Sequence, residues 1–250
     1  MLADHLALRS GISAFIGSGG KTSLIAQCAR ELAERGKKVI VCTTTHIYPF
    51  PDMPLFLTEC GEADPQLLSL PGYGKGKAVC IGTPAADGKL TAPALSFGQL
   101  ASMADHILVE ADGAARHPLK AHASHEPVIP EDAASVICVF GLGGFGRPIG
   151  ESVHRSELFI RRLLQCGGFF DDQISENETA SLPVTPAMAA AVFEAEKTGA
   201  GTIFLNQADL HGAANAADAF IRALKDGPYR IVTGSALTGD AVTASQPVSR

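Results

Sequence analysis

Short apolar runs alternate with amphipathic stretches along most of this 250-residue chain. The runs are almost continuously apolar, which is typical of strands buried on both faces of a parallel sheet, and the stretches between them have helical spacing. The predicted strands are 12–16, 38–43, 106–110, 135–140, 201–205 and 229–233, and the predicted helices are 22–35, 96–104, 155–165, 186–197 and 213–225. This alternation predicts an α/β fold with a doubly wound, mostly parallel sheet.

One region departs from the alternation. Residues 50–93 are rich in proline and glycine, and they predict a small irregular β insertion that carries a small hairpin or edge strands. Its strand candidates are 55–58, 77–82 and 89–92, the last two joined around Asp87–Gly88. We expect a single domain over 1–250, of the P-loop NTPase type, with a frayed tail at about 239–250 because these residues are small and polar.

Composition restricts the class of protein. The net charge of −6 argues against general binding to nucleic acid or to anionic membranes. No apolar stretch approaches the roughly 20 residues of a membrane span, and no basic segment precedes an apolar one at the start of the chain. The six cysteines are scattered without a C-x-x-C pair, which favours reduced thiols and a cytoplasmic protein. The oligomeric state stays open.

The first predicted strand leads into a glycine-rich turn, which a Lys-Thr pair and a helix follow. Glycines let backbone N–H groups approach phosphate oxygens, and a helix start adds its unpaired N–H groups and positive dipole end. The residues expected to bind a nucleotide here are Gly17, Ser18, Gly19, Gly20, Lys21, Thr22 and Ser23. The motif is the shorter G-x-x-G-K-T form of Mur-type ligases, since Phe15 stands where the longer P-loop pattern has its first glycine. The alternative is a plain strand–helix turn with a surface lysine.

Two carboxylates follow the strand 106–110. Glu110 and Asp112 stand at the strand end, where P-loop proteins hold Mg²⁺ directly or through water. We expect Thr22, Glu110 and Asp112 to be the metal ligands, and Lys21, Glu110 and Asp112 to be the catalytic residues. The alternative role for the carboxylates is helix capping or solvation. The segment Thr43–His46 adds three hydroxyls and an imidazole. These groups either bind the γ-phosphate, complete the Mg²⁺ coordination or make local turn bonds.

A possible nucleobase site follows the strand 201–205. The sequence Asn206-Gln-Ala-Asp209 is similar to the guanine-reading N-K-x-D of GTPases, in which Asp accepts from the guanine N1–H and amine. Adenine lacks that donor pair, so GTP is favoured over ATP. Gln207 replaces the lysine of the motif, which weakens this preference.

A loop with three histidines is a second candidate metal site. His117, His122, His125 and Glu126 lie close together in sequence, but their spacing matches no recognised zinc pattern. Metal binding here is therefore the weaker alternative. The basic residues of the same region, Arg116, Lys120, His154 and Arg155, either contact an anion or a partner or are solvated.

The chain resembles the YqeC family. The resemblance covers residues 12–235 approximately, and its most specific blocks are Val109–Gly113, Pro118–Ala121 and His125–Pro130. Five other motifs occur in the same order as in the family: Gly17–Thr22, Thr43–His46, Gly146–Pro148, Val153–Arg155 and Leu205–Asp209. Gly143 departs from the family's usual aspartate, and Gln207 from the lysine of N-K-x-D. The resemblance implies an accessory role in the maturation of a selenium-dependent molybdenum hydroxylase or its cofactor.

We therefore expect a Mg²⁺-dependent nucleotide-binding protein that hydrolyses GTP or ATP, with GTP favoured. Two alternatives remain. One is an ATP-dependent kinase or ligase acting on a small molecule, and the other is a nucleotide-gated carrier of cargo with little turnover.

Overall fold

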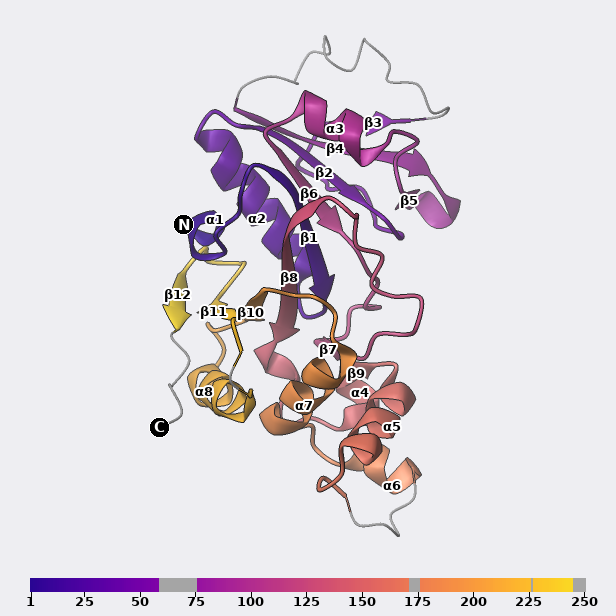
Figure 1. Ribbon diagram of the computed structural model, residues 1–250, viewed down its shortest axis with the longest axis vertical. Helices are drawn as coiled ribbons and strands as arrows, with labels where there is room; N and C mark the ends of the chain where they lie inside the picture. The colour runs from indigo at the N-terminus through magenta and orange to yellow at the C-terminus, as the bar shows by residue number, and fades with distance from the viewer. Residues whose placement is uncertain (59–75, 171–175, 226, 245–250) are drawn as a thin grey trace. The chain divides into compact units, whose positions relative to one another are not determined.

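The computed structural model describes residues 1–58, 76–170, 176–225 and 227–244, and it divides into two compact units (Figure 1). The first unit contains 1–16, 21–113 and 128–137, and the second contains 17–20, 114–127 and 138–250. Strand β8 (Ala133–Gly141) contributes residues to both. Each unit is described by itself.

A parallel sheet forms the centre of the first unit. Its strands are β1 (Gly11–Gly17), β6 (His106–Glu110), β2 (Lys38–Thr43), β4 (Lys77–Pro84) and β3 (Leu55–Leu57), in this spatial order. All neighbours in this series are parallel, and their register pairs Gly11 and Val39 with His106. The short β5 (Leu90–Thr91) is antiparallel to β4.

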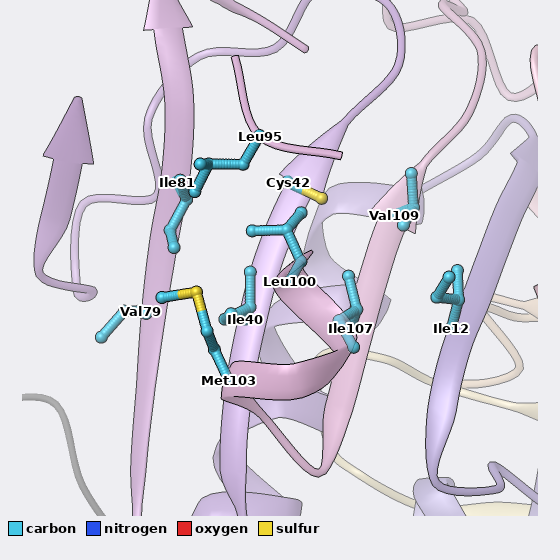
Figure 2. Packing of buried hydrophobic residues seen from close by; sticks show 10 residues of the cluster. All are labelled: Ile12, Ile40, Cys42, Val79, Ile81, Leu95, Leu100, Met103, Ile107 and Val109. Carbon is cyan, nitrogen blue, oxygen red and sulfur yellow. The ribbon is translucent and has the colours of Figure 1, made fainter. Parts of the chain in front are cut away.

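Helices cover both faces of this sheet. Leu100 and Met103 of α3 (Phe97–Met103) pack on one face, against alternate strand residues that include Ile40 and Ile107 (Figure 2). The residues between them, such as Val41, point to the opposite face because side chains alternate along a strand. There α2 (Lys21–Glu34) packs against β2, β4 and β6. The predicted α/β fold, with a mostly parallel sheet and helices on both sides, is confirmed.

Local chemistry sets the helix ends in this unit. Ser96 and Gln99 form a capping box at the start of α3, in which Ser96 Oγ accepts from Gln99 N at 3.2 Å. α2 ends before Gly36, which has a φ of +78°. The short α1 (Leu2–His5) is held by Glu31, whose carboxylate accepts from the backbone N–H groups of Leu2 and Ala3.

The second unit has its own strands, helices and core. β10 (Thr202–Asn206) and β11 (Arg230–Gly234) are parallel, and β12 (Ala241–Ala244) is antiparallel to β11. The other elements are β7 (Leu119–Lys120), β9 (Val153–His154), α4 (Ile149–Ser152), α5 (Ser156–Cys166), α6 (Glu176–Ser181), α7 (Pro186–Glu196) and α8 (Ala213–Ala223). Aromatic rings contribute to the core: Phe140 lies 4.8 Å from Phe220 and 5.7 Å from Phe193 between ring centroids.

The structure differs from the sequence prediction in two regions. Ala241–Ala244 belong to the segment predicted as a frayed tail, but they form β12 because their backbone pairs with β11. The predicted insertion is more regular than expected: β4 and β3 extend the parallel sheet beyond β2 to its edge, and within the described part of the insertion β5 makes a hairpin-like pair with β4. Residues 59–75 of the insertion and 245–250 of the tail lie outside the described residues.

Two further predictions concern the chain as a whole. The single domain over 1–250 and the P-loop NTPase type stay predictions.

Among the described residues, no helix is both long enough and apolar enough to span a membrane.

Candidate functional site

Four of the predicted site residues meet in the first unit. Lys21 is the first residue of α2, and its Nζ lies 2.9 Å from Asp112 Oδ1 and 3.8 Å from Glu110 Oε1. The Thr22 hydroxyl donates to Glu110 Oε2 at 2.9 Å. The convergence follows from topology: β6 ends at Glu110 and Asp112 follows two residues later, while α2 starts after the neighbouring parallel strand β1. We call Lys21, Thr22, Glu110 and Asp112 the acidic cluster.

The acidic cluster is largely withdrawn from water. Lys21 is 3% exposed and Asp112 0% exposed, whereas Thr22 lies at the surface. Burial raises the pKa of Glu110, because it disfavours the charged carboxylate, and the nearby Lys21 charge and Thr22 hydroxyl only partly oppose this rise. With both carboxylates ionised, one lysine faces two negative charges. The cluster therefore carries one surplus negative charge and suits a further cation.

The threonines after β2 serve the backbone turn beside this cluster. Thr43 Oγ1 donates to the Glu110 carbonyl at 2.7 Å and accepts from Thr45 N at 2.9 Å. Thr44 Oγ1 donates to the Val128 carbonyl at 2.7 Å. For Thr43 and Thr44 the structure thus favours the local-bond alternative over γ-phosphate binding. His46 has no hydrogen bond or ion pair to another described residue.

The loop residues 17–20 belong to the second unit, where they are tightly packed. Ser18 N donates to the Val139 carbonyl at 2.9 Å, and Gly19 N donates to the His117 carbonyl at 3.2 Å. A Cβ on Gly19 would lie 2.2 Å from the backbone nitrogen of Gly141, so no larger residue fits there. Two of the amides expected to cradle phosphate therefore bond protein carbonyls instead. The N–H groups of the first turn of α2, which include those of Thr22 and Ser23, have no acceptor within the helix by its geometry.

Asn206 has a structural role that the sequence did not predict. Its Nδ2 donates to the Gly19 carbonyl at 2.7 Å, and its Oδ1 accepts from Ala236 N at 2.9 Å. The side chain is 4% exposed and both ends of its amide are engaged inside the second unit. It therefore clamps the glycine loop, and the role of reading a base would fall to the exposed Asp209. Gln207 accepts from Gly143 N at 3.0 Å through its Oε1.

The basic and histidine-rich region of the second unit forms ion pairs. Glu126 accepts from Lys120 Nζ at 3.0 Å and from both terminal nitrogens of Arg155. Burial raises the pKa of Glu126, but the hydrogen bonds from Arg155 and Lys120 outweigh it, so the pKa lies below its usual value. We call Lys120, Glu126 and Arg155 the basic cluster. The sequence left open whether these cations contact an anion, and it did not identify Glu126 as the carboxylate that they share. The available signal was the presence of a glutamate in a loop rich in basic residues.

The alternative metal site finds no support in the described residues. Among them, no group of three or more His, Cys, Asp or Glu side chains is placed to hold a metal ion. His122 pairs with Glu196, through both its backbone N–H and its ring Nδ1. A Mg²⁺ ion can be held by one or two carboxylates, a hydroxyl and the phosphates of a nucleotide. Such a site does not require three His, Cys, Asp or Glu side chains.

Comparison with known proteins places these residues in a family context. The profile of the family described as "YqeC protein" matches residues 13–157, which contain the acidic and the basic cluster. The chain is also 34% identical over 157 residues to a protein of Escherichia coli (strain K12) named "Uncharacterized protein YqeC". That match covers 60% of this chain and 60% of the relative.

Proposed function

The chain belongs to the YqeC family, and from this premise we propose that it is a Mg²⁺-dependent nucleotide-binding protein that hydrolyses GTP. The observation that carries the proposal is the acidic cluster, in which a buried lysine, two carboxylates and a hydroxyl meet at the start of a helix. Lysine neutralises phosphate charge, and carboxylate and hydroxyl oxygens are ligands that Mg²⁺ prefers.

Binding would exchange partners within the acidic cluster. Lys21 moves from Asp112 to the β- and γ-phosphates, and the N–H groups of the first turn of α2 add their donors and the helix dipole. Glu110, Asp112 and Thr22 would be the residues that hold Mg²⁺, and the ion would supply neutralisation of the phosphate charge. Glu110, the carboxyl with the raised pKa, orients the attacking water. In the sequence, Gly17–Gly20 lead directly into Lys21 and complete the proposed phosphate-binding segment.

Thermal unfolding tests nucleotide binding. GTP, ATP and their diphosphates are compared with and without Mg²⁺, since a ligand that binds only the folded state raises the melting temperature. We expect the largest rise with Mg²⁺ and a triphosphate, and no rise for Lys21→Ala. Lys37→Ala removes an exposed lysine from the same unit and serves as the control. A rise that Lys21→Ala leaves unchanged contradicts the phosphate-binding role of Lys21.

The preference for GTP is tested separately at Asp209. Asp209→Asn should reduce GTP affinity by about tenfold, because a charged acceptor to two guanine donors is lost, while ATP affinity stays unchanged. Asp218→Asn is a matched control, since Asp218 is also exposed and lies in the same unit. Equal losses for GTP and ATP contradict base reading by Asp209.

The biological role we propose is maturation of a selenium-dependent molybdenum hydroxylase, or delivery of its cofactor. It rests on the family resemblance of the motifs around Glu110 and Lys120. In cells that contain such an enzyme, deletion of this chain should abolish hydroxylase activity without reducing the amount of hydroxylase protein, and Lys21→Ala should not restore it. Full hydroxylase activity in the deletion strain contradicts the role.

A second candidate is ATP-dependent transfer to a small molecule, by a kinase or a ligase. It is favoured by the short G-x-x-G-K-T motif and by a hollow with basic side chains in the second unit. Product analysis separates the candidates. A hydrolase converts the triphosphate and water to the diphosphate and phosphate alone, whereas a kinase also yields a phosphorylated acceptor and a ligase also yields a joined product.

A further inference from the structure

The second unit contains a hollow of about 460 Å³ at the start of α5. Its walls come from α4, β9, α5 and the segment around His117, and α4 and α5 lie side by side (Figure 1). Its lining includes the charged residues Arg155, Glu157 and Arg161, together with His117. The volume falls within the range of pockets for small molecules, about 300–1,000 Å³.

The charge around the hollow is positive. Arg155 and the neighbouring Lys120 share the single carboxylate of Glu126. Arg161 is exposed, and none of the described residues forms an ion pair with it. Of the described residues that line the hollow, Glu157 is the only acidic one.

His154 lies beside the same cations. Its ring lies 5.7 Å from that of His117, between centroids. Burial lowers the pKa of His154, and the nearby charges of Lys120 and Arg155 lower it further. The ring nitrogen Nδ1 of His117 is buried and has no hydrogen-bond partner among the described residues.

Backbone donors add to these side chains. The residue before α5, Arg155, has left-handed backbone angles (φ 61°, ψ 51°), and no side chain caps the helix. The N–H groups of Ser156, Glu157 and Leu158 therefore lack acceptors within the helix, and all three residues line the hollow. A left-handed residue followed by helical ones also turns successive N–H groups toward one concave point, which favours anions.

We propose that this hollow binds the phosphate group of a small phosphate monoester, as a second ligand separate from the nucleotide. Arg161 forms charge-assisted hydrogen bonds to the phosphate, and the first turn of α5 supplies backbone donors. Within the same unit the His117 carbonyl accepts from Gly19 N, so the wall of the hollow is bonded to the glycine loop. That the bound monoester is a substrate rests on the proposed function; the binding itself does not.

Calorimetric titration of the nucleotide-free protein with glycerol 3-phosphate tests the proposal. We expect one saturable site whose affinity falls about tenfold in Arg161→Ala, since a hydrogen bond between charged groups is lost. Arg161→Lys keeps the charge and should retain most of the affinity. Arg222→Ala, which removes another exposed arginine of the second unit, should bind as the wild type does.

A second set of titrations separates this site from the nucleotide site. The double variant Lys21→Met with Asp112→Asn, in which no buried carboxylate is left without its lysine, should leave the affinity for glycerol 3-phosphate unchanged, so the hollow can bind even if the nucleotide proposal fails. Affinity that depends on Lys21 and not on Arg161 would overturn the inference, because the probe would then occupy the nucleotide segment. Three other results would also overturn the inference. They are equal losses of affinity in Arg161→Ala and Arg222→Ala, equally tight binding of malonate, and much tighter binding of a phosphoserine peptide.

Discussion

The acidic cluster of the first unit and the basic cluster of the second are opposite in charge but alike in design. In the first, one buried cation, Lys21, faces the carboxylates of Glu110 and Asp112. In the second, one carboxylate, Glu126, accepts from the cations Lys120 and Arg155. The two sets of side chains are unequal in opposite ways: one cation and two carboxylates in the first unit, two cations and one carboxylate in the second.

The opposite charge balance of the two clusters indicates which ligand each would bind. A buried charge is costly unless it is paired, so an unequal set of charges is most stable when a ligand of the opposite sign joins it. The acidic cluster is suited to Mg²⁺ together with a phosphate that takes over Lys21. The basic cluster, beside the hollow at α5, is suited to an anion. Four substitutions in or beside these clusters test this assignment.

Removing the single cation of the acidic cluster should have the largest effect. Lys21→Met leaves Asp112, which is 0% exposed, without its counter-ion. We expect the free energy of unfolding to fall by about 3–5 kcal/mol, the cost of breaking a buried pair, as measured by urea denaturation. The double variant Lys21→Met with Asp112→Asn removes the orphaned charge and should recover most of that loss. A loss for Lys21→Met below about 1 kcal/mol, typical of a surface pair, would contradict the burial argument.

Removing the single anion of the basic cluster should cost less, since Arg155 is partly exposed. Glu126→Gln should lower the free energy of unfolding by about 2 kcal/mol at neutral pH. The folded pKa of Glu126 is depressed, so its contribution is full above the unfolded value near 4.5 and is lost as the pH falls through the folded pKa. The difference from wild type should therefore disappear in acid. Glu131→Gln, at an exposed glutamate, is the control, and a difference that persists at the lowest pH would refute this assignment.

Substitution of Glu110 tests a pH dependence of stability that is opposite to that of Glu126. The folded pKa of Glu110 is raised, so without Mg²⁺ this residue adds stability as the pH falls from that pKa toward the unfolded value near 4.5. Glu110→Gln should remove this acid-linked gain, about 1 kcal/mol for each unit of pKa difference, and abolish any stabilisation by Mg²⁺ with a nucleotide. Paired pH titrations of stability measure both effects. Identical pH profiles for the two proteins would show that Glu110 does not titrate as described.

The smallest effect should come from the turn beside the acidic cluster. Thr44→Val removes the hydrogen bond to the Val128 carbonyl and should cost about 0.5–1 kcal/mol. Nucleotide affinity should stay as in wild type, because this hydroxyl serves the backbone. A large loss of nucleotide affinity with unchanged stability would restore Thr44 as a phosphate ligand.

The fold and the acidic cluster were predictable for the same reason. Hydrophobic runs marked the strands, and parallel strands bring their C-terminal ends to one edge, so Glu110 and Asp112 were expected beside the helix that starts at Lys21. The same rule could not assign Thr43, because its bond to the Glu110 carbonyl depends on the register of β2 with β6.

Long-range partners explain most of what the sequence left undetermined. Asn206 reaches Gly19, which is 187 positions away, and no local spacing reports such a contact. Glu126 and Arg155 are 29 positions apart, so their ion pair could not be read from the loop alone. β12 forms because β11 offers its edge, although residues Ala241–Ala244 carry little apolar pattern of their own.

The central claim is that the acidic cluster holds Mg²⁺ and a nucleotide. Isothermal titration of the wild-type protein with a non-hydrolysable GTP analogue, with and without Mg²⁺, tests it most directly. We expect binding of one nucleotide per chain, at least about tenfold tighter with Mg²⁺, because the carboxylates then have a cation. No binding in either buffer, or equal affinity in both, would contradict it.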